Sequence, residues 1–99
     1  MELGRVTGQV VATIKQDGLC GLKLLLVEAV HPSTGHVTAQ TAYVAVDLAG
    51  AGTGEVVVVT RGSGARVGAG VDAVPTDAAV VAIVDSVVVD GEMTFDKSA

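Results

Sequence analysis

The chain has 99 residues, of which 49% are hydrophobic and 2% aromatic, and its formal net charge is −5. A chain of this length supports one domain with one small core. Its eleven acidic and six basic side chains, with a single Tyr and a single Phe, exclude the basic, aromatic grooves that bind nucleic acid, and they disfavour anionic membranes.

The start of the sequence shows no secretory signal pattern, and its longest apolar run, residues 78–84, is far shorter than the roughly 20 residues of a membrane span. Cys20 is the only cysteine, so no disulfide forms within the chain, and we expect a cytoplasmic protein. Residues 1–66 carry five acids and five bases, whereas the remaining residues carry six acids and only Lys97. We therefore expect an acidic tail at about residues 91–99.

Two strands are predicted in the first third of the chain. Apolar residues alternate over residues 4–14, and the Asp17-Gly18 turn signal follows them. A second strand is expected over residues 23–30. Pro32, two residues later, prevents its continuation because proline lacks a backbone donor. These two strands are expected to form a hairpin.

The third and fourth strands are separated by a loop of small residues. We expect the third strand to run from residue 37 or 38 to Asp47, and the fourth to cover residues 55–60 after a glycine-rich loop at 50–54. The fourth strand contains four consecutive valines, which place apolar groups on both of its faces. We predict that its outward face is covered by a second copy of the chain.

A long fifth strand is predicted near the end of the chain. Four glycines within residues 62–72 make a stable helix improbable there, whereas valine and isoleucine dominate residues 78–89. Asp90-Gly91 then signals a turn, after which the tail adds at most one edge strand. The pattern predicts an all-β chain: a single domain over residues 1–99, built as a small closed β-barrel of five strands.

Neither a cofactor nor a metal site is predicted. The glycine-rich loop at 50–54 precedes a strand, whereas a nucleotide-binding loop precedes a helix whose N-terminus holds the phosphates. His31 and His36 flank a turn with no acid nearby in sequence, and Cys20 has no neighbouring base. Asp47, Asp77 and Asp85 are interpreted as structural carboxylates that accept backbone N–H bonds or pair with arginine, so no catalytic residue is predicted.

Five segments of the chain together resemble one known family. These are the Gly-Arg-Val-x-Gly-x-Val-Val-Ala-Thr run at 4–13, Gly-x-Lys-Leu-Leu at 21–25, Val-Asp-x-x-Gly-Ala-Gly at 46–52, Gly-Ser-x-Ala-Arg at 62–66, and the Asp-Ala-Ala-Val-Val-x-Ile-Val-Asp run at 77–85. In this order and spacing they resemble the vertex proteins of bacterial microcompartments, the EutN/CcmL family of the ethanolamine-utilisation and carboxysome shells.

The resemblance implies a non-enzymatic shell subunit. It implies an OB-like barrel that assembles as a ring-shaped homo-pentamer, caps the five-fold vertices of a microcompartment shell and contacts hexameric shell proteins. The residues that we expect at subunit contacts or at axis loops are Asp47, Gly50, Ala51, Gly52, Gly62, Ser63, Ala65, Arg66, Asp77 and Asp85.

Two other functions remain open at this point. One is a five-fold pore for small metabolites, in which symmetry multiplies the charge of any residue at the axis. The other is an unrelated oligomeric, ligand-binding β-barrel, which requires convergent polar groups in a pocket.

Overall fold

The computed structural model describes residues 1–13, 21–34, 36, 41–62 and 76–98. All regular elements in these residues are strands, so the all-β prediction is confirmed. In chain order they are β1 (Glu2–Val10), β2 (Lys23–Ala29), β3 (Tyr43–Asp47), β4 (Val56–Arg61), β5 (Ala78–Ile83), β6 (Ser86–Val89) and β7 (Glu92–Asp96).

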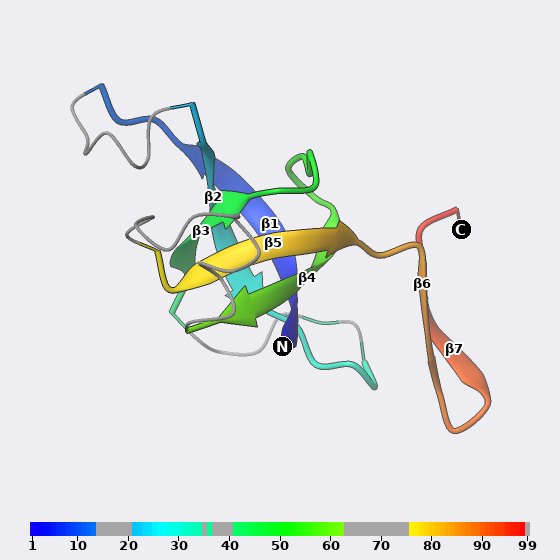
Figure 1. Ribbon diagram of the computed structural model, residues 1–99. Helices are drawn as coiled ribbons and strands as arrows, with labels where there is room; N and C mark the ends of the chain where they lie inside the picture. The colour runs from blue at the N-terminus through cyan, green and yellow to red at the C-terminus, as the bar shows by residue number, and fades with distance from the viewer. Residues whose placement is uncertain (14–20, 35, 37–40, 63–75, 99) are drawn as a thin grey trace.

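The first five strands form a closed barrel, and the last two form a separate ribbon (Figure 1). The strand order around the barrel is β1-β2-β3-β5-β4, and it closes where β1 pairs with β4. All neighbours are antiparallel except β3 and β5, which are parallel. Closure leaves the barrel without an open edge that could pair with other chains. The expected five-stranded barrel is therefore present.

The interior of the barrel is filled by small and β-branched side chains. Every second residue of each strand points inward, and the fully buried residues of β1 and β2 alternate accordingly, whereas β4 also buries Val56 on its other face. The core cluster consists of Val6, Leu25, Val27, Ala45, Ala51, Val57, Val59, Ala78 and Val80. A second, smaller cluster of Val46 and Ala79 lies under Leu22, Leu24 and Val81.

Two expected strands differ from the structure at their ends. The first strand is β1, which begins two residues before the expected residue 4 and ends at Val10. The third strand begins at Tyr43, later than the expected start at residue 37 or 38. Residues 37–40 lie outside the described residues. Both ends lie where pairing partners determine the strand, which periodicity alone does not reveal.

The expected fifth strand is not continuous. The chain leaves the barrel after Ile83, which pairs with Val57, and a new strand begins at Ser86. Asp85 lies at this break, where its carbonyl accepts a hydrogen bond from Lys97 N at 2.8 Å. The prediction was wrong because valine-rich sequence is equally suited to a barrel strand and to the ribbon that follows it.

The four valines of β4 are covered mainly by their own subunit. Val56, Val57 and Val59 are at most 1% exposed, and Val58 is half-buried. Val56 lies on the opposite face of the strand from the core residues Val57 and Val59, and Val84 N donates to its carbonyl at 2.8 Å, which continues the pairing of β4 with the chain after β5. The expectation that a second copy must cover this face is therefore wrong for Val56.

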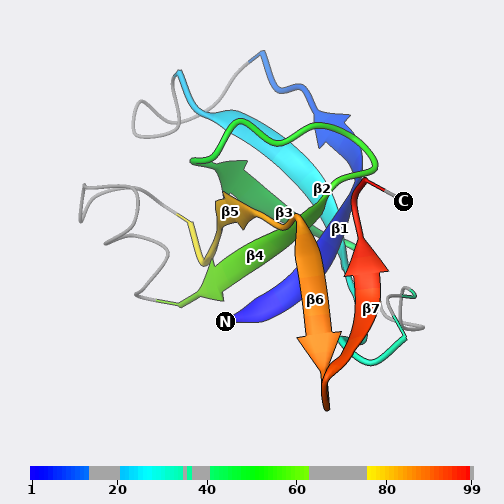
Figure 2. The same cartoon turned by 90° about the vertical axis from the view of Figure 1, so that its right-hand side faces the viewer.

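The last two strands form a hairpin that stands to one side of the barrel in Figure 1, and Figure 2 views the molecule from that side. Asp90 and Gly91 connect them with φ values of 51° and 80°, which is the geometry of a tight two-residue turn, as predicted. The expected edge strand is β7, and it pairs with β6 only, so it adds nothing to the barrel. We refer to β6 and β7 together as the ribbon.

Among the described glycines, Gly4 has the closest neighbouring atom, and it provides a stability test. A Cβ atom at this position would lie 2.5 Å from Val27 Cγ1, and Val27 is completely buried and stiff. We predict that Gly4→Ala lowers the free energy of unfolding by about 1–3 kcal/mol through overpacking. Chemical denaturation of the variant measures this loss.

Gly8→Ala is the matched control on the same strand. A Cβ atom at Gly8 would have its nearest neighbour, Leu26 Cβ, at 3.9 Å. Its expected effect is neutral or stabilising by about 0.5 kcal/mol, because alanine loses less backbone entropy than glycine on folding. Equal destabilisation by both substitutions would contradict the close approach at Gly4.

Candidate functional site

The loop between β3 and β4 is held by the carboxylate of Asp47. Asp47 Oδ1 accepts hydrogen bonds from the backbone N–H groups of Ala49 and Gly50, both at 3.0 Å. Its side chain is only 2% exposed, and Oδ2 lies 3.9 Å from Lys23 Nζ. Lys23 Nζ also donates to the Ala51 carbonyl at 2.9 Å. The predicted structural role of Asp47 is confirmed, with lysine in place of arginine as its partner.

The far end of the same loop is held by Glu55. Glu55 Oε1 accepts a hydrogen bond from Gly52 N at 2.7 Å, and Oε2 forms an ion pair with Lys97 Nζ, also at 2.7 Å. The hydrogen bond from Lys97 and then the one from Gly52 lower the pKa of the Glu55 carboxyl, and the same contact raises the pKa of Lys97. The Glu55 carboxylate therefore connects the loop to the end of the ribbon.

These contacts decide what the glycine-rich loop can bind. A phosphate-binding loop offers several backbone N–H groups to an anion. Here the N–H groups of Ala49, Gly50 and Gly52 are already taken by the carboxylates of Asp47 and Glu55. These backbone donors of the loop thus already have acceptors within the subunit. The loop also leads into a strand and not into a helix.

A second polar cluster lies on the barrel where β1, β3 and β4 contribute one residue each. Tyr43 Oη donates to Glu2 Oε2 at 2.5 Å, and the Arg61 guanidinium lies 3.6 Å from the same oxygen. Arg61 Cζ is also 4.4 Å from the centre of the Tyr43 ring, a cation–π contact. Burial, and then the hydrogen bond to Glu2, raise the pKa of the Tyr43 phenol. The phenol stays protonated and acts as a structural donor.

The predicted contact residues fall into two groups at opposite ends of β4. Near its start are Asp47, Gly50, Ala51 and Gly52, and Asp85 is joined to this group because Lys97 bonds both Asp85 O and Glu55. Ala51 is completely buried in the core of its own subunit, so its side chain supports the loop from inside.

The second group lies at the other end of β4. Gly62 N donates to the Asp77 carbonyl at 2.8 Å, which brings the end of β4 to the start of β5. The bond uses the backbone of Asp77, whereas its carboxylate was the expected acceptor. Ser63, Ala65 and Arg66 lie outside the described residues, as does Cys20.

The sequence reasoning missed the long-range ion pairs. Glu2, Tyr43 and Arg61 are brought together only by strand pairing, and Lys97 was assigned to an acidic tail. One local signal for Glu55 was present, because an acid directly after Gly54 opens the fourth strand. His31 and His36 share a backbone hydrogen bond at 3.1 Å, and the described part of the chain contains no group of three His, Cys, Asp or Glu placed to hold a metal.

Apolar surface remains exposed at several places on the single subunit. The ribbon exposes 60% of Val88 and 57% of Met93. An open apolar groove on the barrel wall is lined by Met1, Leu3, Val30, Pro32 and Val58 together with Glu2. Within the described residues no helix is present that could cross a membrane. The described residues thus combine exposed apolar surface with a loop held by carboxylates, which is typical of a subunit that makes contacts in an assembly.

Comparisons with known proteins agree with that class. The family described as "Ethanolamine utilisation protein EutN/carboxysome" matches residues 1–85. The chain is 45% identical to the bacterial microcompartment shell vertex protein EutN of Escherichia coli K12, over 98% of this chain and 100% of the relative. It is 39% identical to the carboxysome shell vertex protein CcmL of Synechococcus elongatus, over 98% of this chain and 96% of the relative.

Solved structures show the same relationship. The CcmL structure of Gloeobacter violaceus superposes with a TM-score of 0.91 at 39% identity, covering 100% of both chains. A GrpN structure from Rhodospirillum rubrum, described as a pentameric microcompartment shell protein, gives a TM-score of 0.80 at 43% identity, covering 90% of this chain and 99% of that chain. The chain belongs to the EutN/CcmL family of bacterial microcompartment shell vertex proteins. It is a structural protein of the shell and not an enzyme.

The Glu55–Lys97 contact predicts a pH dependence. Because the folded pKa of Glu55 is lowered, its contribution to stability is present above the ordinary value of 4.5 and is lost as the pH falls through the folded value. We predict that Glu55→Gln flattens the loss of thermal stability below pH 4.5. Thermal unfolding between about pH 6 and pH 3 measures the slope.

Glu92→Gln is the control for this experiment. Glu92 lies exposed at the turn end of the ribbon, and its substitution by Gln removes one negative charge, as Glu55→Gln does. It should retain the acid slope of the unsubstituted protein. If Glu55→Gln also retains that slope, the ion pair to Lys97 does not stabilise the folded state.

Proposed function

We propose that five copies of this chain form a ring that closes the five-fold vertices of a bacterial microcompartment shell, bordered by hexameric shell proteins. The observation that carries the proposal is the likeness, over nearly the whole chain, to shell vertex proteins, one of which has a pentameric structure. The ring is expected to lie in the cytoplasm as part of the shell.

Geometry explains why a shell needs such a ring. A layer of six-fold tiles lies flat, and it closes into a polyhedron only where five-fold units replace some of the tiles. The vertex subunit therefore has to be rigid and to present the same contact to each neighbour. A closed barrel with a braced crossing loop satisfies the first requirement.

Charge sets a constraint on the contacts within the ring. Each chain carries a net charge of −5, so five copies together carry −25. Like charges repel in a compact assembly, and the contacts therefore have to bring acidic surface against basic surface or bury apolar area. The exposed apolar side chains of the ribbon offer such area.

The contact residues inferred from the sequence remain part of the proposal. Asp47, Gly50, Gly52 and Asp85 are assigned to the contact near the crossing loop, and Gly62 with Asp77 to the opposite end of β4. Ser63, Ala65 and Arg66 are assigned to the same segment as Gly62. Ala51 is assigned only a supporting role, because it is buried in its own subunit.

The mass of the assembly tests the ring directly. Five copies of the 9.8 kDa chain have a mass of about 49 kDa. We predict this mass for the purified protein in native mass spectrometry and in light scattering at micromolar concentration. A single species of 9.8 kDa under these conditions would rule out the ring.

The role at the vertex requires a second experiment. We predict that co-production with a hexameric shell protein gives closed polyhedral particles in electron microscopy, whereas the hexameric protein alone gives sheets or tubes. Particles formed with and without this chain should be compared at matched levels of the hexameric protein. Closed particles of the same kind in both samples would contradict a vertex role.

A further inference from the structure

The ribbon presents two different faces. Val87 pairs with Phe95, and these two residues together with Val89 are half-buried. On this ribbon Thr94 Oγ1 also donates to the Pro32 carbonyl at 2.6 Å, so the ribbon leans on its own subunit. The alternate residues, which include Ser86 and Val88, form the open face.

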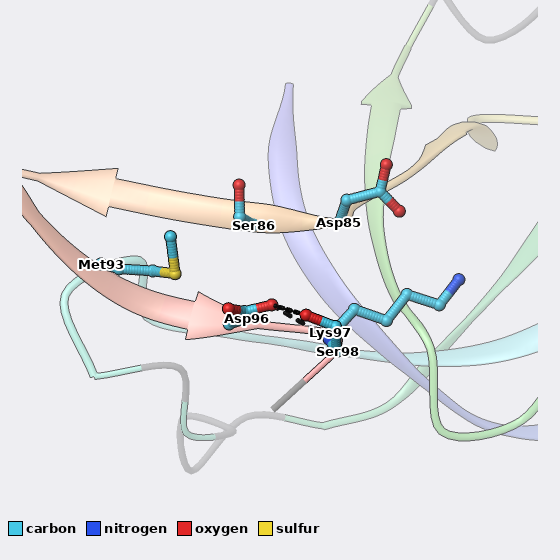
Figure 3. A pocket seen from close by; sticks show the side chains of 6 residues that line it. All are labelled: Asp85, Ser86, Met93, Asp96, Lys97 and Ser98. Carbon is cyan, nitrogen blue, oxygen red and sulfur yellow. Dashed lines mark hydrogen bonds between the residues drawn. The ribbon is translucent and has the colours of Figure 1, made fainter.

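The open face has an apolar centre. Val88 and Met93 lie directly opposite each other in the register, and they are 60% and 57% exposed. Beside them, Ser86 and Asp96 form the next pair toward the barrel. Met93 lines an open crevice together with Asp85, Ser86, Asp96, Lys97 and Ser98 (Figure 3). Exposed apolar pairs of this kind on a projecting element are typical of a contact surface.

The ribbon is held in place before it meets any partner. A two-stranded hairpin alone is marginally stable in water. Here Lys97 N bonds the Asp85 carbonyl at 2.8 Å, Lys97 Nζ bonds Glu55 at 2.7 Å, and Thr94 bonds Pro32. The first of these bonds closes the base of the ribbon, and the contacts with Glu55 and Pro32 fix its angle to the rest of the subunit. A preorganised surface loses less entropy when it binds.

Charge favours the barrel of another copy over a second ribbon as the partner. The ribbon and its base carry Asp85, Asp90, Glu92 and Asp96 against Lys97 alone, whereas residues 1–66, which include four of the five barrel strands, carry five acids and five bases and are neutral. Two ribbons packed together would place acid against acid, which is destabilising. A ribbon against the neutral part of a barrel avoids that repulsion, and it is a head-to-tail contact, which closes into a ring when the rotation permits.

We infer that the open face of the ribbon, centred on Val88 and Met93, docks on the outer wall of the barrel of the next copy in the ring. The inference rests on the proposed pentamer and specifies which element of the chain makes its contact. Each subunit then contributes one ribbon and receives one, so all five contacts are equivalent.

Methionine oxidation tests the contact on the unaltered protein. The chain has two methionines, and Met1 and Met93 are 90% and 57% exposed in the single subunit. Oxidation of a methionine follows its exposure, so in the assembled protein we expect Met93 to react with peroxide about tenfold more slowly than a methionine derivative added to the same solution. Mass spectrometry of the peptides gives both rates. Equal rates for Met93 and the added derivative, in protein shown to be pentameric, would overturn the inference and leave the ring standing.

Substitution on the open face is the second test. Met93→Glu places a charge in the contact. We expect it to raise the concentration at which half of the subunits are assembled by about a hundredfold. Ser33→Glu adds the same charge at an exposed loop position and should leave assembly unchanged. Circular dichroism verifies that both variants are folded.

The outcomes separate this inference from the proposed function. An unsubstituted chain that stays monomeric refutes the pentamer itself. A pentamer that survives Met93→Glu refutes the ribbon contact alone. Protection of Met93 that appears only after a hexameric shell protein is added assigns the open face to that protein, and it likewise overturns docking between copies.

Discussion

The insertion of β5 between β3 and β4 is the constraint on which the rest of the structure depends. Val46 and Asp47 at the end of β3 pair in parallel with Ala79 and Val80, while the other edge of β5 pairs antiparallel with β4. Without this strand the barrel would have two open edges and a gap beside its smallest side chains. The last strand of the barrel to be synthesised therefore completes it.

This topology imposes the crossing loop and its polar contacts. The chain must leave β3, pass the end of β5 and enter β4 on the far side. Within residues 48–55, backbone bonds to barrel strands lie near the two ends of the loop, from Leu48 N to Val80 O at 3.0 Å and from Gly54 N to Val6 O at 2.7 Å. Backbone N–H groups in such a crossing need acceptors. Asp47 and Glu55 supply them at the two ends, each with a lysine beside it. Because Lys97 follows β7, the same contacts also set where the ribbon points.

The sequence predicted the barrel better than it predicted the surfaces. Continuous apolar runs between proline and glycine breaks were sufficient for β2 and β4, and the Asp90-Gly91 signal was sufficient for the turn, since these depend on local chemistry. The division of the valine-rich run 78–89 was not predictable, because Asp85 marks an exit from the barrel only once β4 is in place. Lys97 could not be assigned either, since its partner Glu55 is 42 residues away. The contacts of Glu2, Tyr43 and Arg61 are likewise products of register.

The apolar excess of the chain also indicates association of subunits, but through different residues from those first expected. A hydrophobic content of 49% in 99 residues is more than a small barrel needs for its wall. Three of the four valines of β4, which were expected to carry the surplus outward, are buried in their own subunit, and the exposed apolar side chains lie elsewhere, among them Val88 and Met93 on the ribbon. Contact through a projecting ribbon leaves the closed barrel undisturbed, because its core and its crossing loop are complete within one chain. The subunit can therefore fold first and associate afterwards, with the angle of the ribbon carried over from the folded monomer.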